Sequence, residues 1–324
     1  MKFVKKVATF GRLLLSGDRA VLQNRARYNW LTWQTWRFGG RPFVFRKDGI
    51  RLVCFPANAD SQLISALPST DQFEFSLLRQ WLRPGDGFID GGANLGTYAA
   101  AAAQFVGASG WVLAIDAGET LVPLLDESAR LLGHRHWRSL HAAIGDHTGQ
   151  ASFYQTVEGG STLGQSLRVE RSQLVQYREC HVPMLTLASL ASEYCSDMPV
   201  AVKLDLEGAE GQAVGSSPAS WRQRDGPLWI VEINPTALAL FDSAAATITS
   251  YFPAPAFEHW VVPKGADAGG VPALPRLLTP SETWSDSSYY NMLAIPLGKK
   301  HQDRRGRLER LLRRAIQIHP KSAT

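Results

Sequence analysis

Residues 88–98 read Phe88-Ile89-Asp90-Gly91-Gly92-Ala93-Asn94-Leu95-Gly96-Thr97-Tyr98, and this stretch decides the fold of the 324-residue chain. A short apolar strand ends in an acid, the chain turns through glycines, and an alanine-rich helix follows. Gly92 and Gly96 have no Cβ, so the backbone can turn tightly and approach a ligand closely. The amide groups at the start of the helix point back toward that ligand. The stretch therefore predicts a ligand-binding turn between a strand and a helix.

Strands and helices alternate along most of the chain. This alternation predicts a mostly parallel sheet with helices on both of its faces. Asp48-Gly49 predicts the turn of a β-hairpin ahead of the sheet, and the proline-rich residues 253–280 are expected to form a loop. Apolar runs predict sheet strands at residues 87–90, 111–115, 137–142, 201–205, 228–233 and 291–295.

The basic residues are concentrated at the two ends of the chain. Residues 1–47 contain eleven Lys or Arg residues and one acid, and residues 299–314 contain eight and two. Since the net charge of the whole chain is +5, the region between these ends is acidic. A nucleic-acid-binding domain has a basic face instead, so no nucleic-acid partner is expected. The basic ends predict peripheral contact with an anionic membrane or polysaccharide.

Other features of the sequence narrow the class of protein. An uncharged apolar run of about 18 residues, the length that crosses a membrane, is not found. The first 16 residues carry lysines and a short apolar run, but no small-residue cleavage site follows, so no secretory signal is expected. Cys54, Cys180 and Cys195 are scattered, which predicts reduced thiols rather than a zinc site or a disulfide framework. These features predict a cytoplasmic protein.

Polar residues stand where the predicted parallel strands end. Ligands of open α/β sheets bind at this edge. Asp90 ends the first core strand, and Asp116 ends the second, where a carboxylate can accept hydrogen bonds from both ribose hydroxyls. After the third strand, the backbone near Ala143 and the side chain of Asp146 can meet an adenine ring, although Gly145-Asp146 is equally consistent with a simple turn.

A second block of charged residues follows the fourth core strand. The sequence Lys203-Leu204-Asp205-Leu206-Glu207-Gly208-Ala209-Glu210 comes directly after an apolar run. Strand alternation puts Lys203, Asp205 and Glu207 on one side if the strand continues that far. Two carboxylates and a lysine at a strand end suit polar substrate binding or proton transfer.

Taken together, these blocks resemble the FkbM family of S-adenosylmethionine (SAM)-dependent methyltransferases. The resemblance covers about residues 70–298 and is carried by the blocks at 84–96, 114–116, 202–210 and 231–233, with residues 291–296 similar to the closing strand of the family. It implies a Rossmann-like class I methyltransferase fold: a mostly parallel seven-stranded sheet with helices on both faces and an antiparallel last strand. It also implies O-methylation of a hydroxyl on a sugar, glycan or natural-product acceptor.

The resemblance also implies roles for individual residues. Asp205 and Glu207 would face the methyl group and the acceptor as catalytic residues, and Asp116 would hold the ribose. Two departures from the family are visible: Ile115-Asp116-Ala117 stands where Phe-Glu-Pro is usual, and Gly91 replaces a β-branched residue. The loop that would hold the amino-acid end of SAM comprises Asp90, Gly91, Gly92, Ala93, Asn94 and Gly96.

The chemistry asked of the protein is limited, because SAM carries its own leaving group. The protein must align a nucleophile and take up a proton if that nucleophile is a hydroxyl. Asp205 and Glu207 are the first candidates for this base, ahead of His141 and His181. The sequence contains no cluster of oxygen ligands spaced as in a metal site, so no metal is expected.

Two alternatives stay open at this stage. An NAD(P)-dependent oxidoreductase can use a similar sheet, but Ala93 stands where its fingerprint needs a glycine. A non-catalytic scaffold on a methyltransferase fold would use the Trp-rich N-terminus and the basic ends as its interaction surface. We expect three parts of the chain: an N-terminal extension (1–69), the SAM-binding domain (70–298) and a basic amphipathic tail (299–324).

Overall fold

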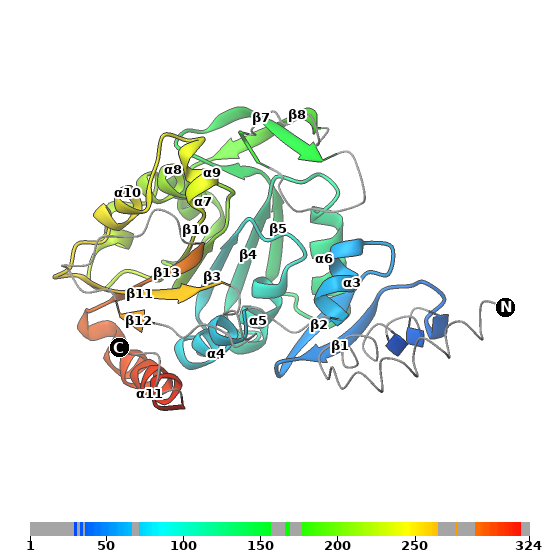
Figure 1. Ribbon diagram of the computed structural model, residues 1–324, viewed down its shortest axis with the longest axis horizontal. Coiled ribbons are helices and arrows are strands. Elements are labelled where there is room, and N and C mark those ends of the chain that lie inside the picture. The colour runs from blue at the N-terminus through cyan, green and yellow to red at the C-terminus, as the bar shows by residue number, and fades with distance from the viewer. Residues whose placement is uncertain are drawn as a thin grey trace, which may run out of the picture.

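The structure is a computed structural model, shown in Figure 1. It describes residues 29–30, 33–34, 36–66, 71–156, 166–168, 177–264, 276–277 and 289–318. Residues 1–28, 157–165 and 169–176 lie outside the described residues. For residues 313–318, only the backbone of the helix is described.

In the part of the chain that the structure describes, the main sheet has eight strands in the order β12-β11-β13-β10-β9-β3-β4-β5. The pairs β10–β9, β9–β3, β3–β4 and β4–β5 are parallel, whereas β13 runs antiparallel to both of its neighbours. Without the two-residue edge strand β12, this is the predicted seven-stranded sheet with an antiparallel last strand, so the fold class is confirmed. The strands are β3 (Gly87–Gly91), β4 (Trp111–Asp116), β5 (Trp137–His141), β9 (Ala201–Leu204), β10 (Leu228–Ile233), β11 (Phe257–Pro263), β12 (Arg276–Leu277) and β13 (Tyr290–Pro296).

Helices cover both faces of this sheet (Figure 1). The face that carries Phe88 packs against four helices: α4 (Gln72–Trp81), α5 (Thr97–Val106), α6 (Val122–Leu132) and α11 (Gln302–Ile318). The face that carries Ile89 packs against α7 (Leu187–Tyr194), α8 (Glu210–Gly215), the 3-10 helix η1 (Ala219–Arg222), α9 (Pro235–Ala239) and α10 (Ala245–Ser250).

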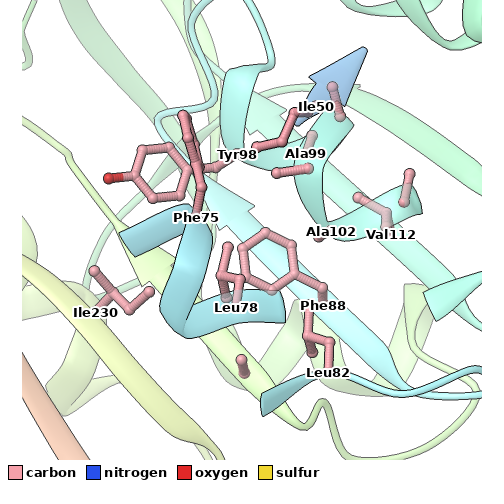
Figure 2. Close-up of a cluster of buried hydrophobic side chains, with 14 of the residues drawn as sticks. Ile50, Phe75, Leu78, Leu82, Phe88, Tyr98, Ala99, Ala102, Val112 and Ile230 are labelled. Atoms are coloured by element: carbon pink, nitrogen blue, oxygen red, sulfur yellow. The ribbon is translucent and has the colours of Figure 1, made fainter. Parts of the chain in front are cut away.

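The two cores follow from strand alternation. Successive side chains of a strand point to opposite faces, and Phe88 and Ile89 accordingly enter different hydrophobic clusters although both are completely buried. Figure 2 shows the cluster on the first face, where Phe75 and Leu78 of α4 meet Phe88 of β3 beside the alanines of α5. The alanines let α5 lie close to the sheet, and this fixes the helix whose N-terminus follows the glycine turn.

A β-hairpin precedes the sheet, as predicted. It consists of β1 (Phe43–Lys47) and β2 (Ile50–Cys54), joined at Asp48-Gly49. Both turn residues have positive φ, 50° and 78°, as a type I′ turn requires. The hairpin buries alternate residues in the same cluster as α4 and α5, and α3 (Ala59–Ala66) connects it to the sheet domain.

A smaller sheet of three strands lies beside the main one, in the order β6-β8-β7. Its strands are β6 (Ala143–Ile144), β7 (Gly149–Thr156) and β8 (Tyr177–Leu185), and β7 pairs with β8 in antiparallel register. Helix α7 follows β8 directly. Thr186 caps it, because its side chain accepts from the amide of Ser189, whose side chain in turn accepts from the Thr186 amide.

The basic C-terminal segment begins with the 3-10 helix η2 (Lys299–His301) and continues as α11. Leu308 and Leu312 of α11 are buried in the cluster that also contains Trp81 of α4. The His301 ring stacks on that tryptophan at 5.4 Å between ring centres. The apolar face of this helix is therefore covered by the sheet domain, at least as far as Leu312.

The predicted loop at 253–280 is wrong in part, because residues 257–263 form β11 within the main sheet. Prolines led to the interpretation as a loop, yet Trp260, Val261 and Val262 are buried between the two helix layers. In the described ranges, no helix is both long and apolar enough to span a membrane.

Candidate functional site

A cavity of about 220 Å³ opens at the carboxyl ends of the parallel strands. Residues from the ends of β3, β4, β9 and β10 meet here, which is the edge at which α/β sheets bind ligands. Its polar wall contains four carboxylates and one lysine, and its apolar wall contains aliphatic and aromatic side chains. The lining includes Gly92, Asn94, Ile115, Asp116, Leu121, Ala142, Ala143, Ile144, Phe153, Asp205, Glu207, Glu232, Lys264 and Tyr289.

The glycine turn after β3 forms the floor of this cavity. The amides of Gly92 and Ala93 both donate to the carbonyl oxygen of Ile115, at 2.9 and 3.0 Å. Gly92 has a φ of +69°, and a Cβ at this position would lie 1.8 Å from the backbone oxygen of Asp205. Only glycine permits this approach of the turn to the loop after β9.

Asp90 points away from the cavity and does not line it. Its Oδ2 accepts a hydrogen bond from the Ala99 amide in the first turn of α5, at 2.9 Å, and its Oδ1 lies 3.7 Å from the Lys203 ammonium. Burial, only partly offset by Lys203 and the Ala99 amide, raises the pKa of Asp90 to about 6. Asp90 thus connects the glycine turn with α5 and β9 on the side away from the cavity.

Asp116 lies at the end of β4 and lines the cavity. Its two oxygens accept from the backbone amides of Asn94, at 2.7 Å, and Gly118, at 2.8 Å. Burial raises the pKa of Asp116, against the opposing effect of these two hydrogen bonds. A carboxylate has about four lone-pair sites, so Asp116 can still accept from ligand hydroxyls.

The remaining residues of the glycine turn support it without lining the cavity. Gly91 and Ala93 are buried. A Cβ on Gly91 would come within 2.8 Å of the Leu204 side chain. Gly96 has a φ of +74° and precedes α5, where a Cβ would lie 2.7 Å from the Trp137 ring.

The candidates for the adenine end lie apart from one another. Ala143 is buried and lines the cavity, next to the apolar side chain of Ile144. The Asp146 side chain is exposed, and it accepts from Nδ1 of His147 at 2.7 Å outside the cavity lining. The structure therefore brings Ala143, but not Asp146, to the cavity.

Asp205 is the centre of the polar wall. Its Oδ2 lies 3.3 Å from the ammonium of Lys203 and 3.9 Å from that of Lys264. Burial by itself disfavours the carboxylate, but the two lysines outweigh it and lower the pKa of Asp205 to about 2. Lys203 also donates to the Gly92 carbonyl at 3.2 Å, so it joins the glycine turn to Asp205.

Three further residues complete this wall, and the sequence-based site omitted them. Glu232, the penultimate residue of β10, accepts a hydrogen bond from the ammonium of Lys264, which follows β11. Tyr289, just before β13, donates to the same Glu232 oxygen at 2.7 Å. The acid at the end of a core strand was visible in the sequence, but its partners come from segments that carried no recognisable pattern.

Glu207 lines the cavity from the loop after β9. Its φ is +52°, a left-handed conformation that is uncommon outside glycine. Glu210 holds this loop, because its buried carboxylate accepts from the amides of Leu206, at 2.6 Å, and Gly208, at 3.0 Å. Burial raises the pKa of Glu210 to about 7.

The histidines considered as bases lie outside the cavity lining. A ring nitrogen of His141 hydrogen-bonds the Ala117 carbonyl at 3.0 Å, and His181 is exposed on β8. Among the residues that the structure describes, no group of His, Cys, Asp and Glu side chains is arranged to hold a metal ion.

The family model described as the methyltransferase FkbM domain matches residues 90–259 of the chain. This range contains the glycine turn, Asp116, Asp205, Glu207 and Glu232, and it covers just over half of the sequence. The comparison with curated proteins gives no match.

The solved structures that match the chain include the following three methyltransferases. The FkbM methyltransferase from Methylobacillus flagellatus KT has 12% identity and a TM-score of 0.39, over 70% of this chain and 50% of that one. An rRNA methylase from Streptococcus thermophilus has 11% identity and a TM-score of 0.40, over 71% and 98%. A SAM-dependent O-methyltransferase from Thermotoga maritima has 12% identity and a TM-score of 0.36, over 78% and 77%. These values are too low to transfer an acceptor from any of these proteins.

Proposed function

Since the chain belongs to the FkbM methyltransferase family, and thus acts as a SAM-dependent methyltransferase, we propose that it methylates a hydroxyl group of a sugar, glycan or natural product. SAM supplies a methyl group bound to a sulfonium. The sulfur is a good leaving group and needs no help from an acid. The protein therefore has to bind the cofactor, orient the acceptor and accept one proton. Family membership also favours this activity over the oxidoreductase considered from the sequence.

The chemistry of the cavity fits SAM. Asp116 keeps lone pairs free for the ribose hydroxyls, and the apolar side chains of Ile115 and Leu121 suit an adenine ring. Because Gly92 has no Cβ, the backbone of this turn can come close to the ligand. Asn94 lines the same region, where the amino-acid end of the cofactor would lie.

The observation that carries the choice of a hydroxyl acceptor is the pair of carboxylates beyond this cofactor region. Asp205 and Glu207 line the cavity from the loop after β9, next to Glu232. Carboxylates accept hydrogen bonds from hydroxyl groups, hold them in place and can take up the proton that is lost on methylation. Phe153 adds an apolar surface to the cavity lining, against which a sugar ring or a natural product can pack.

The test is incubation of the protein with methyl-labelled SAM and a panel of neutral sugars, glycans and hydroxylated natural products. Label transfer and the mass of one added methyl group are measured, with matched deoxy compounds as controls. We expect transfer only to compounds that retain the hydroxyl. Transfer confined to amines or thiols, added to the panel as further acceptors, would contradict O-methylation while leaving the methyltransferase assignment intact.

A further inference from the structure

We propose that Asp205 and Glu232 act as one carboxyl pair that receives the proton of the acceptor hydroxyl, and that Lys264 and Tyr289 hold this pair in place. This inference rests on the proposed function. It adds to Asp205 and Glu207 a third carboxylate, Glu232 of the neighbouring strand, and two residues from segments beyond the core of the sheet.

The geometry of the sheet brings the two carboxylates together. β9 and β10 are parallel neighbours with Ile230 beside Lys203 and Val231 beside Leu204, so the next residues along each strand direction are Glu232 and Asp205. Their side chains are within hydrogen-bonding reach of each other. Two carboxyl groups this close share a proton, because both cannot ionise freely.

The hydrogen bonds of Glu232 indicate where that proton lies. One of its oxygens, Oε1, accepts from both Lys264 and Tyr289, which leaves the other free to carry a proton toward Asp205. Burial and the neighbouring Asp205 charge raise the pKa of Glu232 to about 8, although Lys264 opposes the shift. Burial and the Asp205 charge thus favour a state of the unliganded protein in which the pair shares one proton.

Such a pair is a suitable proton acceptor near neutral pH. With one proton already bound, it can take a second only at a pKa near that of Asp205, about 2. When both carboxyls are ionised, the first proton returns at about 8, close to the pH at which a general base works best. The competent state is therefore the doubly ionised pair.

The positive charge of the cofactor would produce that state. A cation within about 4–6 Å lowers a carboxyl pKa by about 1–3 units, so a sulfonium beside the pair would expel its proton. During methyl transfer the acceptor oxygen bonds to the methyl carbon as the carbon–sulfur bond breaks. The acceptor O–H bond also breaks, and its proton passes to the doubly ionised pair, which returns to the singly protonated form.

Several other charged or titratable groups face the pair and influence its titration. They come from the strands on either side, from α4 and α5, and from the loops that line the cavity. They are Lys203 and Asp90 beside Asp205, Lys264 and Tyr289 beside Glu232, Asp71 and Glu74 at α4, Tyr98 of α5, and Asp116, Glu207 and Glu210 around the cavity.

The test is titration calorimetry of SAM and S-adenosylhomocysteine at pH 7 in buffers with different enthalpies of ionisation. The two ligands share every group except the methyl on sulfur, so the difference in protons released reports the effect of the sulfonium. We expect wild-type protein to release about 0.4–0.9 more protons with SAM, given a lowering by about 1–3 units from about 8. Glu232→Gln should lose this difference, and Glu127→Gln, on α6 and outside the cavity lining, should keep it.

The outcomes separate the two proposals. If neither ligand binds the folded wild-type protein, the proposed function fails, and this inference fails with it. If both ligands bind but wild type shows no difference in proton release, or Glu232→Gln shows the same difference, only the carboxyl pair is refuted.

A second variant keeps the proposal testable if Glu232→Gln does not fold. Tyr289→Phe removes one donor to the Glu232 carboxylate from a side chain that is about half exposed, so the fold should persist. We expect the infrared band of the protonated carboxyl to disappear at a pH about one unit higher than in wild type, because a donor to the ionised form is lost. An unchanged midpoint would refute the holding role of Tyr289.

Discussion

Arg304 of the C-terminal helix binds the carboxylate of Asp86 through both ends of its guanidinium group. Nη2 donates to Oδ1 at 2.9 Å, and Nη1 donates to Oδ2 and to the Trp81 carbonyl. Both side chains are nearly buried, at 12% and 10% exposure. The contact ties α11 to the turn that starts the first core strand.

Removing Arg304 should destabilise the whole domain. Arg304→Ala leaves the Asp86 carboxylate buried without its partner, which costs about 3–5 kcal/mol for a buried pair. Urea unfolding measures the free energy of unfolding. Arg130→Ala, which breaks the exposed pair with Glu127, should leave that free energy nearly unchanged, and an equal loss in both variants would contradict a structural role for α11.

Gly92→Ala should damage both stability and cofactor binding. The new Cβ would meet the Asp205 carbonyl at 1.8 Å, so the turn or the loop after β9 must move. We expect a loss of about 2–5 kcal/mol, combining overpacking with left-handed strain, and weaker binding of S-adenosylhomocysteine in calorimetry.

A matched glycine separates strain from crowding. Gly133 has a similar φ of +77°, but a Cβ there has no atom within 4 Å. Gly133→Ala should therefore cost only the strain of about 1–2 kcal/mol and leave ligand affinity unchanged. A ligand affinity of Gly92→Ala equal to that of Gly133→Ala would contradict the close approach at the cavity floor.

The pH dependence of stability should reflect the buried acid Glu74. Its Oε1 accepts from the Asn291 side chain at 2.7 Å, and burial raises its pKa from 4.5 to about 7. The folded state therefore favours the protonated form of Glu74. The contribution of this group to the free energy of unfolding is complete below pH 4.5 and is lost as the pH rises through 7. We expect Glu74→Gln to remove about 1–3 kcal/mol of the decline between pH 5 and 8, measured by urea unfolding at each pH. An unchanged slope in this variant would show that Glu74 is ionised throughout.

Contact of the basic ends with an anionic surface is still a prediction, and the structure changes how to test it. Deleting residues 299–324 would expose the core that Leu308 and Leu312 cover, so charge reversal is preferable. Arg305, Arg307 and Arg310 of α11 lie together near Arg83. Burial lowers the pKa of Arg307, and the positive charges of neighbouring arginines lower it further.

We expect reversal of these three arginines to glutamate to weaken binding to phosphatidylserine-containing vesicles by at least about 100-fold, since each basic residue contributes about 1 kcal/mol near such a surface. Co-sedimentation measures the affinity. Equal binding of this variant and wild type would remove α11 from the contact. The control variant reverses Arg130 of α6, Arg138 of β5 and Arg135 in the segment between them.

Much of the site could be predicted, because the predicted parallel strands indicate which residues lie together at one edge of the sheet. The acids Asp116 and Asp205 end parallel strands, and the carboxyl ends of such strands lie at one edge. Asp90 follows the same rule, yet its carboxylate faces α5. Which side of the sheet a strand-end residue faces depends on the packing of the helices, which the sequence does not state.

Lys264 and Tyr289 could not be predicted for a different reason. Both approach Glu232 from segments after β11 and before β13, far from any motif. Nearby prolines hid β11, although the β-branched and aromatic residues at 260–262 were a weak signal of a strand. Their role in the wall follows from tertiary contacts alone.

The central claim is that the cavity binds SAM through Asp116. Calorimetric titration of SAM and S-adenosylhomocysteine into wild type, Asp116→Ala and Asp116→Asn tests it most directly, with the exposed Asp126→Ala on α6 as the control. Loss of hydrogen bonds to this carboxylate should cost about 1.5–3 kcal/mol, or about 10- to 150-fold in affinity, in Asp116→Ala. Asp126→Ala should bind as wild type does. Absence of binding to the folded wild-type protein, or unchanged affinity in Asp116→Ala, would contradict the claim.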